Sequence, residues 1–198
     1  MNTRTPPMPD DERAAKTLDL ISVGGTDVAR WARTESLATQ WDERAQRCSD
    51  YIPAGSKVLD VGCGAMALKA ALKPGCSYTG ADVVERASGA LVVDLNRKEF
   101  PEGKYDWVTF LGVLEYIHEP KWPISQAAKA APNMLLTYCC DITQGRSISL
   151  RLGMGWVNNL TYESILALIR ECGWRVDCEA MDKKGAHNHQ YMFICSRP

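Results

Sequence analysis

Three aspartates and two glycines stand at the ends of predicted strands, where they could hold a small ligand. Asp60 comes two residues before Gly62, which forms a turn with Gly64, and Asp82 and Asp94 end the next two predicted strands. Glycine lets ligand atoms approach the backbone closely, and a carboxylate can accept hydrogen bonds from ribose hydroxyls or an amino group. These residue types in this order predict a binding site for a ligand that contains a nucleoside.

The position of Asp60 separates two classes of ligand. The pattern Gly62-x-Gly64-x-x-Ala67 also satisfies the dinucleotide fingerprint, which accepts alanine at its third position. A dinucleotide brings two phosphates to this turn, and a carboxylate just before the turn would repel them. The pattern therefore favours an amine-bearing nucleoside cofactor over NAD.

Short apolar runs that alternate with helical patterns would position these residues. The runs before residue 140 are largely apolar, as strands are when helices cover both faces of their sheet. The predicted strands are 57–61, 77–81, 90–93, 107–111, 134–138, 174–180 and 190–196, the last two joined by a polar hairpin. Alternation of this kind favours a doubly wound α/β sheet.

Helices are predicted between these strands and ahead of them. The shorter ones lie at 66–72, at 124–131 and between Thr161 and Gly173. One long helix is predicted over 31–52, because apolar residues recur there at the spacing of one helix face. The residues of that face are Ala38, Trp41, Ala45, Cys48 and Ile52.

The start of the chain differs in composition from the rest. It contains three prolines and several acids within its first dozen residues. We therefore expect a flexible segment over 1–25, followed by one domain over 26–198 that begins with the long helix as a cover.

Composition excludes several functions for this chain of 198 residues, which has a net charge of -1. Scattered lysines and arginines do not form the basic stripe of a nucleic-acid binder, and no window approaches the ~18 apolar residues of a membrane span. No signal peptide is evident, so a cytoplasmic location is expected. The eight cysteines include no Cys-x-x-Cys pair, which favours reduced thiols over a metal site. Oligomeric state is left open.

Four motifs together resemble the class I S-adenosylmethionine-dependent methyltransferases, over a stretch from about Trp41 to the C-terminus. The motifs are Val58-Leu59-Asp60-Val61-Gly62-Cys63-Gly64, Gly80-Ala81-Asp82, Val93-Asp94-Leu95 and the segment 105–117. The resemblance implies a Rossmann-like sheet of seven strands with an antiparallel last strand and helices on both faces. It also implies S-adenosyl-L-methionine as the cofactor.

The resemblance assigns contacts to the cofactor residue by residue. Asp60 and the turn of Gly62, Cys63 and Gly64 would hold the methionine end of the cofactor. Asp82 would accept hydrogen bonds from the ribose.

The adenine end of the cofactor would lie between four further residues. Val83 would meet the face of the adenine, Asp94 and Leu95 its edge, and Leu111 would form the floor. Met66 departs from the family pattern, because many members have a third glycine there. The short segment 83–89 also departs from it, because a parallel crossover usually needs about a dozen residues.

Methyl transfer from a sulfonium is an in-line displacement, which depends mainly on holding donor and acceptor together. An oxygen or nitrogen acceptor that loses a proton would use a general base, and His118 is the candidate because it follows the fourth strand. Tyr116 stands where the family often has a histidine. His187 and His189 are further candidates in the loop of the closing hairpin.

The segment 141–159 has no clear period and is predicted to be a long insertion, in which Trp156 is a candidate lid over the acceptor. The predicted function is transfer of a methyl group to oxygen or nitrogen, rather than carbon, of a small-molecule acceptor. One alternative is a methyltransferase fold that has lost catalysis and serves as a binding or scaffold protein. An NAD-linked oxidoreductase is the less favoured alternative.

Overall fold

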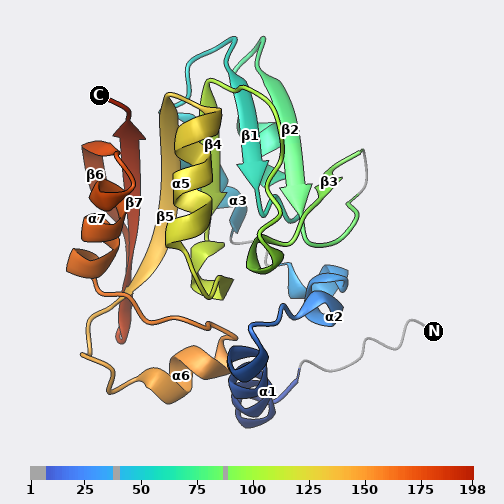
Figure 1. Ribbon diagram of the computed structural model, residues 1–198, viewed down its shortest axis with the longest axis vertical. Coiled ribbons are helices and arrows are strands. Elements are labelled where there is room, and N and C mark those ends of the chain that lie inside the picture. The colour runs from blue at the N-terminus through green and yellow to red at the C-terminus, as the bar shows by residue number, and fades with distance from the viewer. Residues whose placement is uncertain (1–7, 38–40, 87–88) are drawn as a thin grey trace.

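Seven strands form one sheet in the order β3-β2-β1-β4-β5-β7-β6, shown by the computed structural model in Figure 1. The structure describes residues 8–37, 41–86 and 89–198. The strands are β1 Lys57–Val61, β2 Ser77–Asp82, β3 Leu91–Val92, β4 Trp107–Leu111, β5 Asn133–Asp141, β6 Arg175–Lys184 and β7 Asn188–Ser196. β7 runs antiparallel to β5 and β6, and the other pairs are parallel. The predicted seven-stranded sheet with an antiparallel last strand is confirmed.

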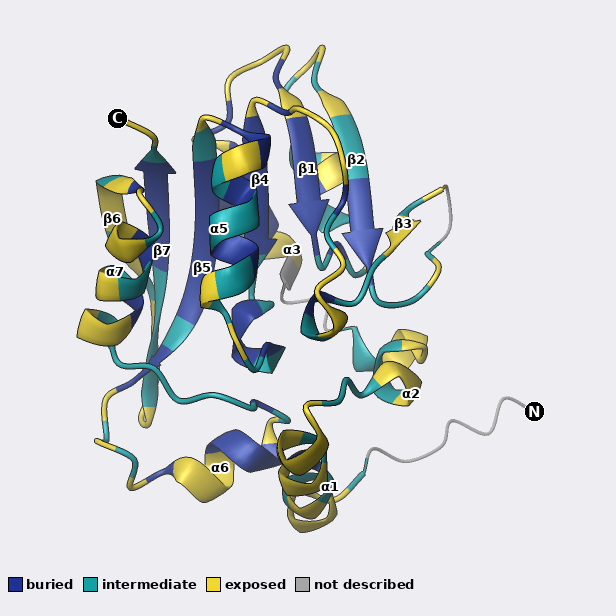
Figure 2. Cartoon of the chain, viewed as in Figure 1, coloured by how far each residue is buried: buried dark blue, intermediate teal, exposed yellow. Residues whose placement is uncertain are grey.

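Helices cover both faces of this sheet, as predicted. The helices are α1 Asp10–Val23, α2 Val28–Trp31, η1 Thr34–Ser36, α3 Trp41–Ser49, α4 Ala67–Ala71, η2 Leu95–Arg97, η3 Leu114–Tyr116, α5 Lys121–Ala130, α6 Ile148–Gly153 and α7 Tyr162–Glu171. α5 and α7 bury Ile124 and Ile169 against one face, and α3 and α4 bury Cys48 and Leu68 against the other. Figure 2 shows that β1, β4 and β5 are largely buried.

The helices α1, α2 and α6, which we call the cover, lie beyond the carboxyl ends of the parallel strands (Figure 1). α1 packs against α6, where the Thr17 hydroxyl donates to the Leu152 carbonyl at 2.9 Å from a position 135 residues earlier. Three acids in the first turn of α1 favour helix formation through the helix dipole, and Gly24 ends it at φ 64°. For residues 10–23 this corrects the expectation of a flexible segment over 1–25. The acids begin a helix there, and its partner comes from a distant part of the chain.

The predicted single helix over 31–52 is wrong, because the described residues between α2 and α3 include extended backbone. Arg33 and Leu37 have β-region angles, with ψ of 125° and 111°. Residues Thr34–Ser36 form only a short 3₁₀ turn, and serine and threonine have a low helix propensity. Among the described residues of the predicted range, Trp31 ends α2 and the residues Trp41–Ser49 form α3. Ala38 lies outside the described residues, as does the side chain of Trp41.

The short connection between β2 and β3 is possible because β3 has only two residues. Leu91 pairs with Ala81 and Val92 with Asp82 in parallel register. Such a short edge strand needs no full crossover helix, and the described residues of the segment 83–90 contain none. The departure noted in the sequence therefore does not alter the strand order.

The closing hairpin is longer than predicted. His189 lies in β7 and pairs with Lys184, so its placement in the hairpin loop is wrong. His187 is in that loop. The pairing of β7 with β5 over nine residues extends the hairpin strands.

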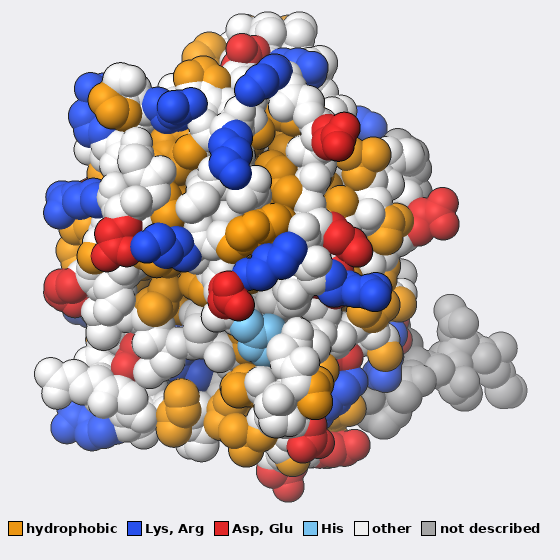
Figure 3. All heavy atoms as spheres, in the orientation of Figure 1, with side chains coloured by type: hydrophobic (Ala, Val, Ile, Leu, Met, Phe, Trp, Pro, Cys, Tyr) orange, Lys and Arg blue, Asp and Glu red, His pale blue; other side chains and the backbone are white. Residues whose placement is uncertain are grey.

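Two general predictions can be compared with the surface and the thiols. None of the described helices is long and apolar enough to cross a membrane. Figure 3 shows Lys and Arg side chains interspersed with Asp and Glu over one face. All eight cysteines are free thiols, in agreement with their spacing in the sequence.

Candidate functional site

A cavity of about 1000 Å³, partly open to solvent, lies at the carboxyl ends of β1, β2 and β4. All residues predicted to hold the cofactor line it. They are Asp60, Gly62, Cys63, Gly64, Asp82, Val83, Asp94, Leu95 and Leu111. The fold therefore brings the separate strand-end motifs into one space, which we call the nucleoside cavity.

The glycine turn after β1 has a conformation that depends on its residue types. Gly62 has φ 76°, and a Cβ at this position would overlap the side chain of Val113. The backbone N–H groups of Gly62 and Cys63 both donate to the Ala81 carbonyl, at 2.7 and 3.0 Å. Met66 adopts φ 59°, the left-handed conformation that glycine favours. The turn thus keeps the backbone shape of a third glycine despite the methionine side chain.

Asp60 is fixed between the two strands that flank β1. It is 3% exposed, and its carboxylate accepts hydrogen bonds from the Thr109 and Tyr78 hydroxyls, both at 2.7 Å. Burial raises the pKa of the Asp60 carboxyl, and these two hydrogen bonds act against that rise. The sequence analysis did not identify Thr109 or Tyr78. The polar Thr109 within an otherwise apolar strand was the available signal.

Asp82 is the centre of a second group of hydrogen bonds. Its carboxylate accepts from the backbone N–H groups of Gly64 and Val83, at 2.8 and 2.7 Å. It also pairs with the guanidinium of Arg86 at 3.3 Å, and both side chains are mostly buried. The pair is within the nucleoside cavity, and the sequence analysis did not identify Arg86.

Asp94 connects the sheet to the cover. Its carboxylate accepts hydrogen bonds from the Thr26 hydroxyl at 2.8 Å and from the Asn96 backbone at 3.0 Å. The Asn96 amide in turn donates to the Thr26 hydroxyl and to the Tyr116 carbonyl. The residues after α1 are thereby held against the predicted adenine end of the cavity.

Arg44 of α3 also reaches the nucleoside cavity. Its guanidinium donates to the Leu111 carbonyl at 2.7 Å, at the end of β4. Gly112 has φ 73°, and a Cβ there would overlap this guanidinium. Arg44 was missed because nothing in the sequence near it indicates which strand end it contacts.

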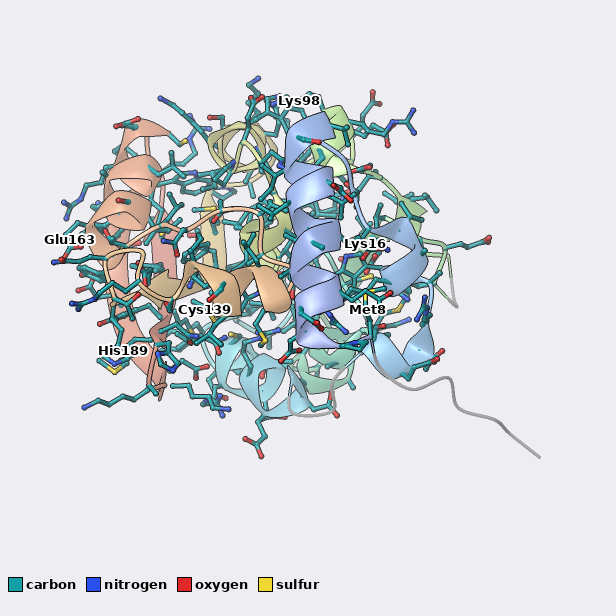
Figure 4. The ribbon with its side chains drawn as sticks, turned by 90° about the horizontal axis from the view of Figure 1, so that it is seen from below. Met8, Lys16, Lys98, Cys139, Glu163 and His189 are labelled. Atoms are coloured by element: carbon teal, nitrogen blue, oxygen red, sulfur yellow. The ribbon has the colours of Figure 1, made fainter. Side chains whose placement is uncertain are left out.

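His118 does not line the nucleoside cavity. Its Nε2 lies 2.9 Å from the Gly25 carbonyl, and its backbone N–H donates to the Asn96 side chain at 3.0 Å. His118 thus helps to hold the segment that joins α1 to α2. Figure 4 shows His189 on the opposite side of the molecule from Lys16 of α1.

Trp156 is buried at 8% exposure, and the guanidinium of Arg151 lies 4.6 Å from the centre of its ring. Trp156 does not line the nucleoside cavity. The neighbouring Gly155 lines a second, smaller cavity beside it, which Trp156 does not line either. Trp31 lines both cavities. Among the tryptophans of the cover region, the structure thus brings Trp31 rather than Trp156 to the site.

Comparisons with known proteins identify the family. The sequence profile of a family described as a methyltransferase domain matches residues 32–179, well over half of the chain. No curated protein matches it.

Solved structures share its fold at low sequence identity. Magnesium protoporphyrin IX methyltransferase ChlM from Synechocystis PCC 6803, solved with bound S-adenosylhomocysteine, is 19% identical, with 94% of this chain and 99% of that chain covered and a TM-score of 0.61. The mitomycin 7-O-methyltransferase MmcR is 18% identical, with 96% and 69% covered and a TM-score of 0.66. The cyclase SpnF is 14% identical, with 79% and 80% covered and a TM-score of 0.63.

The strand order, the glycine turn between strand-end carboxylates and the family profile agree with one another. The chain belongs to the class I S-adenosylmethionine-dependent methyltransferases.

Proposed function

We propose that this methyltransferase transfers a methyl group from S-adenosylmethionine to an oxygen or nitrogen of a small-molecule acceptor. The observation that carries the proposal is the convergence of Asp60, Asp82 and Asp94 around the glycine turn in one cavity. Three carboxylates suit a ligand with an amine, a ribose and an adenine, and they would repel a dinucleotide's phosphates at this turn.

The residues that would hold the methionine end and the ribose are those of β1, its turn and β2. The turn of Gly62, Cys63 and Gly64 lines the cavity, and glycine is needed at 62 because a Cβ there would overlap Val113. Asp60 would present its carboxyl group, held by Thr109 and Tyr78, to the methionine amine. Asp82 would accept hydrogen bonds from the ribose hydroxyls, which would replace its ion pair with Arg86.

The residues that would hold the adenine come from the next two strand ends. Val83 contacts the face of the adenine, Asp94 and Leu95 meet its edge, and Leu111 forms the floor. When bound, S-adenosylmethionine supplies a methyl group on a positively charged sulfur, and its transfer leaves neutral S-adenosylhomocysteine and releases the acceptor's proton. The chain's contribution is to align the acceptor and keep out water beneath the cover.

A small acceptor is supported by the charge and by the relatives of the fold. The net charge is -1, and the face in Figure 3 shows no extended basic area. Two of the similar structures are named for the methylation of a porphyrin and of mitomycin, the latter at oxygen. These names support small-molecule O-methylation as the first chemistry to test.

His118 is the proposed proton acceptor for an acceptor group that must lose a proton. Its ring contacts the Gly25 carbonyl, so this role requires the segment after α1 to shift when ligands bind. A base contributes about 100-fold or more to such a step. We expect His118→Gln to lower kcat by about that factor and to change its pH profile. An unchanged pH profile would leave His118 with its structural contact alone.

The experiment that tests the proposal is calorimetric titration with S-adenosylmethionine, S-adenosylhomocysteine and NAD. We expect the first two to bind the wild type and to lose at least about tenfold in affinity in Asp82→Ala, because hydrogen bonds to a charged group contribute about 1.5–3 kcal/mol. Asp177→Ala, on β6 far along the sheet from β2, is the matched control and keeps wild-type affinity. Binding of NAD alone would contradict the proposal.

A protein that has lost catalysis is the second candidate. The observation that favours it is the Arg86 guanidinium on Asp82, where the ribose would bind. The similarity to SpnF, which is named a cyclase, fits a fold that supports other roles. Release of S-adenosylhomocysteine with any acceptor of a small-molecule panel would exclude this candidate. Cofactor binding without turnover across the panel would favour it.

A further inference from the structure

A second cavity lies beside the nucleoside cavity, and we call it the Arg30 cavity. It lies between α1, α2, η3 and the segment after α6, and its volume is about 310 Å³ when the solvent at its open mouth is counted. Thr26, Trp31 and Tyr116 line both cavities, so the two spaces share a wall. A ligand in the Arg30 cavity would therefore lie next to one in the nucleoside cavity.

The guanidinium of Arg30 is held in one orientation at this cavity. Its Nη1 donates to the Met154 carbonyl at 2.8 Å, and its central carbon lies 4.5 Å from the centre of the Trp31 ring. The ring of Tyr116 is on another side, with its centre 5.5 Å away. A planar guanidinium fixed in this way is prepared to bind a planar anionic group.

No acid forms a direct ion pair with Arg30 among the residues that the structure describes. Asp27, the acid of the cavity, is paired with Lys16 at 2.6 Å and accepts from the backbone N–H of Arg30 at 3.1 Å. Among the described residues, no carboxylate forms an ion pair with the guanidinium, and its buried Nε has no hydrogen-bond partner. Burial lowers the pKa of Arg30, Tyr116 and Asp27 act against this, and the charge of Arg13 lowers it further. A charge left in this state is costly unless an anion joins it.

The backbone after α6 is shaped around this guanidinium. Gly155 has φ 81°, and a Cβ there would overlap Nη1 of Arg30. Any other residue would therefore displace the charged group as well as strain the backbone. The absence of a side chain at Gly155 thus leaves room for the guanidinium of Arg30 from α2.

We propose that Arg30 binds the carboxylate of a single-ring aromatic acid, which is the methyl acceptor. The proposal rests on the proposed function, because it places the acceptor beside the cofactor. The other walls of the cavity suit a ring, since Leu20, Val157, Trp31 and Tyr116 supply apolar and aromatic surface. A ring in this cavity would lie next to the nucleoside cavity, because the two share Thr26, Trp31 and Tyr116 as lining residues.

The test compares an acid with its neutral amide in the protein saturated with S-adenosylhomocysteine. The probes are 4-hydroxybenzoate and 4-hydroxybenzamide, and their Kd values are measured by titration. We expect the wild type to bind the acid about tenfold more tightly than the amide. Arg30→Gln should lose this preference, and Arg30→Lys should keep part of it because a charge without the planar fork remains.

The matched control is Arg146→Gln, in the insertion that also contains Met154; Arg146 is exposed, and its side chain contacts the Thr143 carbonyl. It should keep the full preference for the acid. Titration with S-adenosylhomocysteine is repeated on every variant, and unchanged affinity shows that the nucleoside cavity is intact. If Arg30→Gln does not fold, the test is made with Arg30→Lys, in which the preference for the acid over the amide should be smaller than in the wild type.

Three results would overturn the inference while leaving the proposed function in place. They are equal binding of acid and amide by the wild type, no measurable binding of either probe, and a preference for the acid that survives in Arg30→Gln. Failure of the wild type to bind S-adenosylhomocysteine would instead contradict the proposed function.

Discussion

The nucleoside cavity and the Arg30 cavity share a wall but are built in different ways. The carboxylates and the glycine turn of the first come from short motifs at neighbouring strand ends, fixed by the register of the sheet. Those of the second come from the cover, where Arg30 meets the Met154 carbonyl 124 residues later in the chain. The cofactor side is thus set by local sequence within one sheet, and the acceptor side by how distant segments pack.

The largest effect should come from the glycine turn. Gly62→Ala places a Cβ onto Val113 at a backbone position with φ 76°. We expect a loss of more than about 100-fold in affinity for S-adenosylhomocysteine, by calorimetry, since overlap and an unfavourable φ together cost several kcal/mol. The control Gly55→Ala has the same kind of backbone, φ 78°, with no atom near its Cβ. Equal losses in both variants would contradict the argument from overlap.

The next effect concerns the insertion that supports the Arg30 cavity. Burial acts to raise the pKa of Asp141, but hydrogen bonds from Thr143, Gly145 and Asn159 outweigh it and lower the pKa to about 2. Since the unfolded carboxyl titrates near 3.9, the ionised group stabilises the fold above about pH 4, and this is lost as the pH falls toward 2.

Asp141→Asn should therefore lower the free energy of unfolding by about 2 kcal/mol at pH 7, with a difference that shrinks below pH 4. Urea unfolding at a series of pH values measures it, with the exposed Asp50→Asn as control. If the difference in the free energy of unfolding did not depend on pH, the charge of Asp141 would not contribute to stability.

A smaller effect should separate the two cavities from each other. Gly155→Ala moves the guanidinium of Arg30, so we expect about a tenfold weaker Kd for 4-hydroxybenzoate with an unchanged Kd for S-adenosylhomocysteine. Gly145→Ala has φ 84° with no atom near its Cβ and serves as control. Parallel loss of both affinities in Gly155→Ala would show that the two cavities do not act separately.

The smallest effect concerns the ion pair within the nucleoside cavity. Arg86→Ala leaves Asp82 without the partner that the ribose must replace, so affinity for S-adenosylhomocysteine should rise about threefold, by calorimetry. The exposed Arg97→Ala is the control. Weaker binding in Arg86→Ala would mean that Arg86 contacts the cofactor itself.

The sequence predicted what depends on neighbouring residues. Alternating strands and helices indicated the sheet, and the carboxylates at the carboxyl ends of β1, β2 and β3 were found because the carboxyl ends of parallel strands meet at one edge. The glycine turn was recognised because the strand before it and the helix after it are adjacent to it in the sequence.

What depends on distant contacts was not predicted. α1 was missed because its partner α6 follows more than a hundred residues later, and the helix over 31–52 was overextended because apolar spacing alone does not register the break before α3. Arg30 and Arg44 were missed because their contacts are carbonyls, which any residue provides. The spacing of residue types along the sequence does not indicate which distant segments will be in contact.

The hydrogen bond between Thr26 and Asp94 links the occupancy of the two cavities thermodynamically. An adenine that engages Asp94 competes with the Thr26 hydroxyl, which helps to position the cover and lines both spaces. The coupling free energy between the two sites is the same whichever ligand binds first, because coupling between sites is reciprocal. The affinity for the acceptor therefore differs between the protein with and without cofactor by the same factor as the affinity for the cofactor differs with and without acceptor.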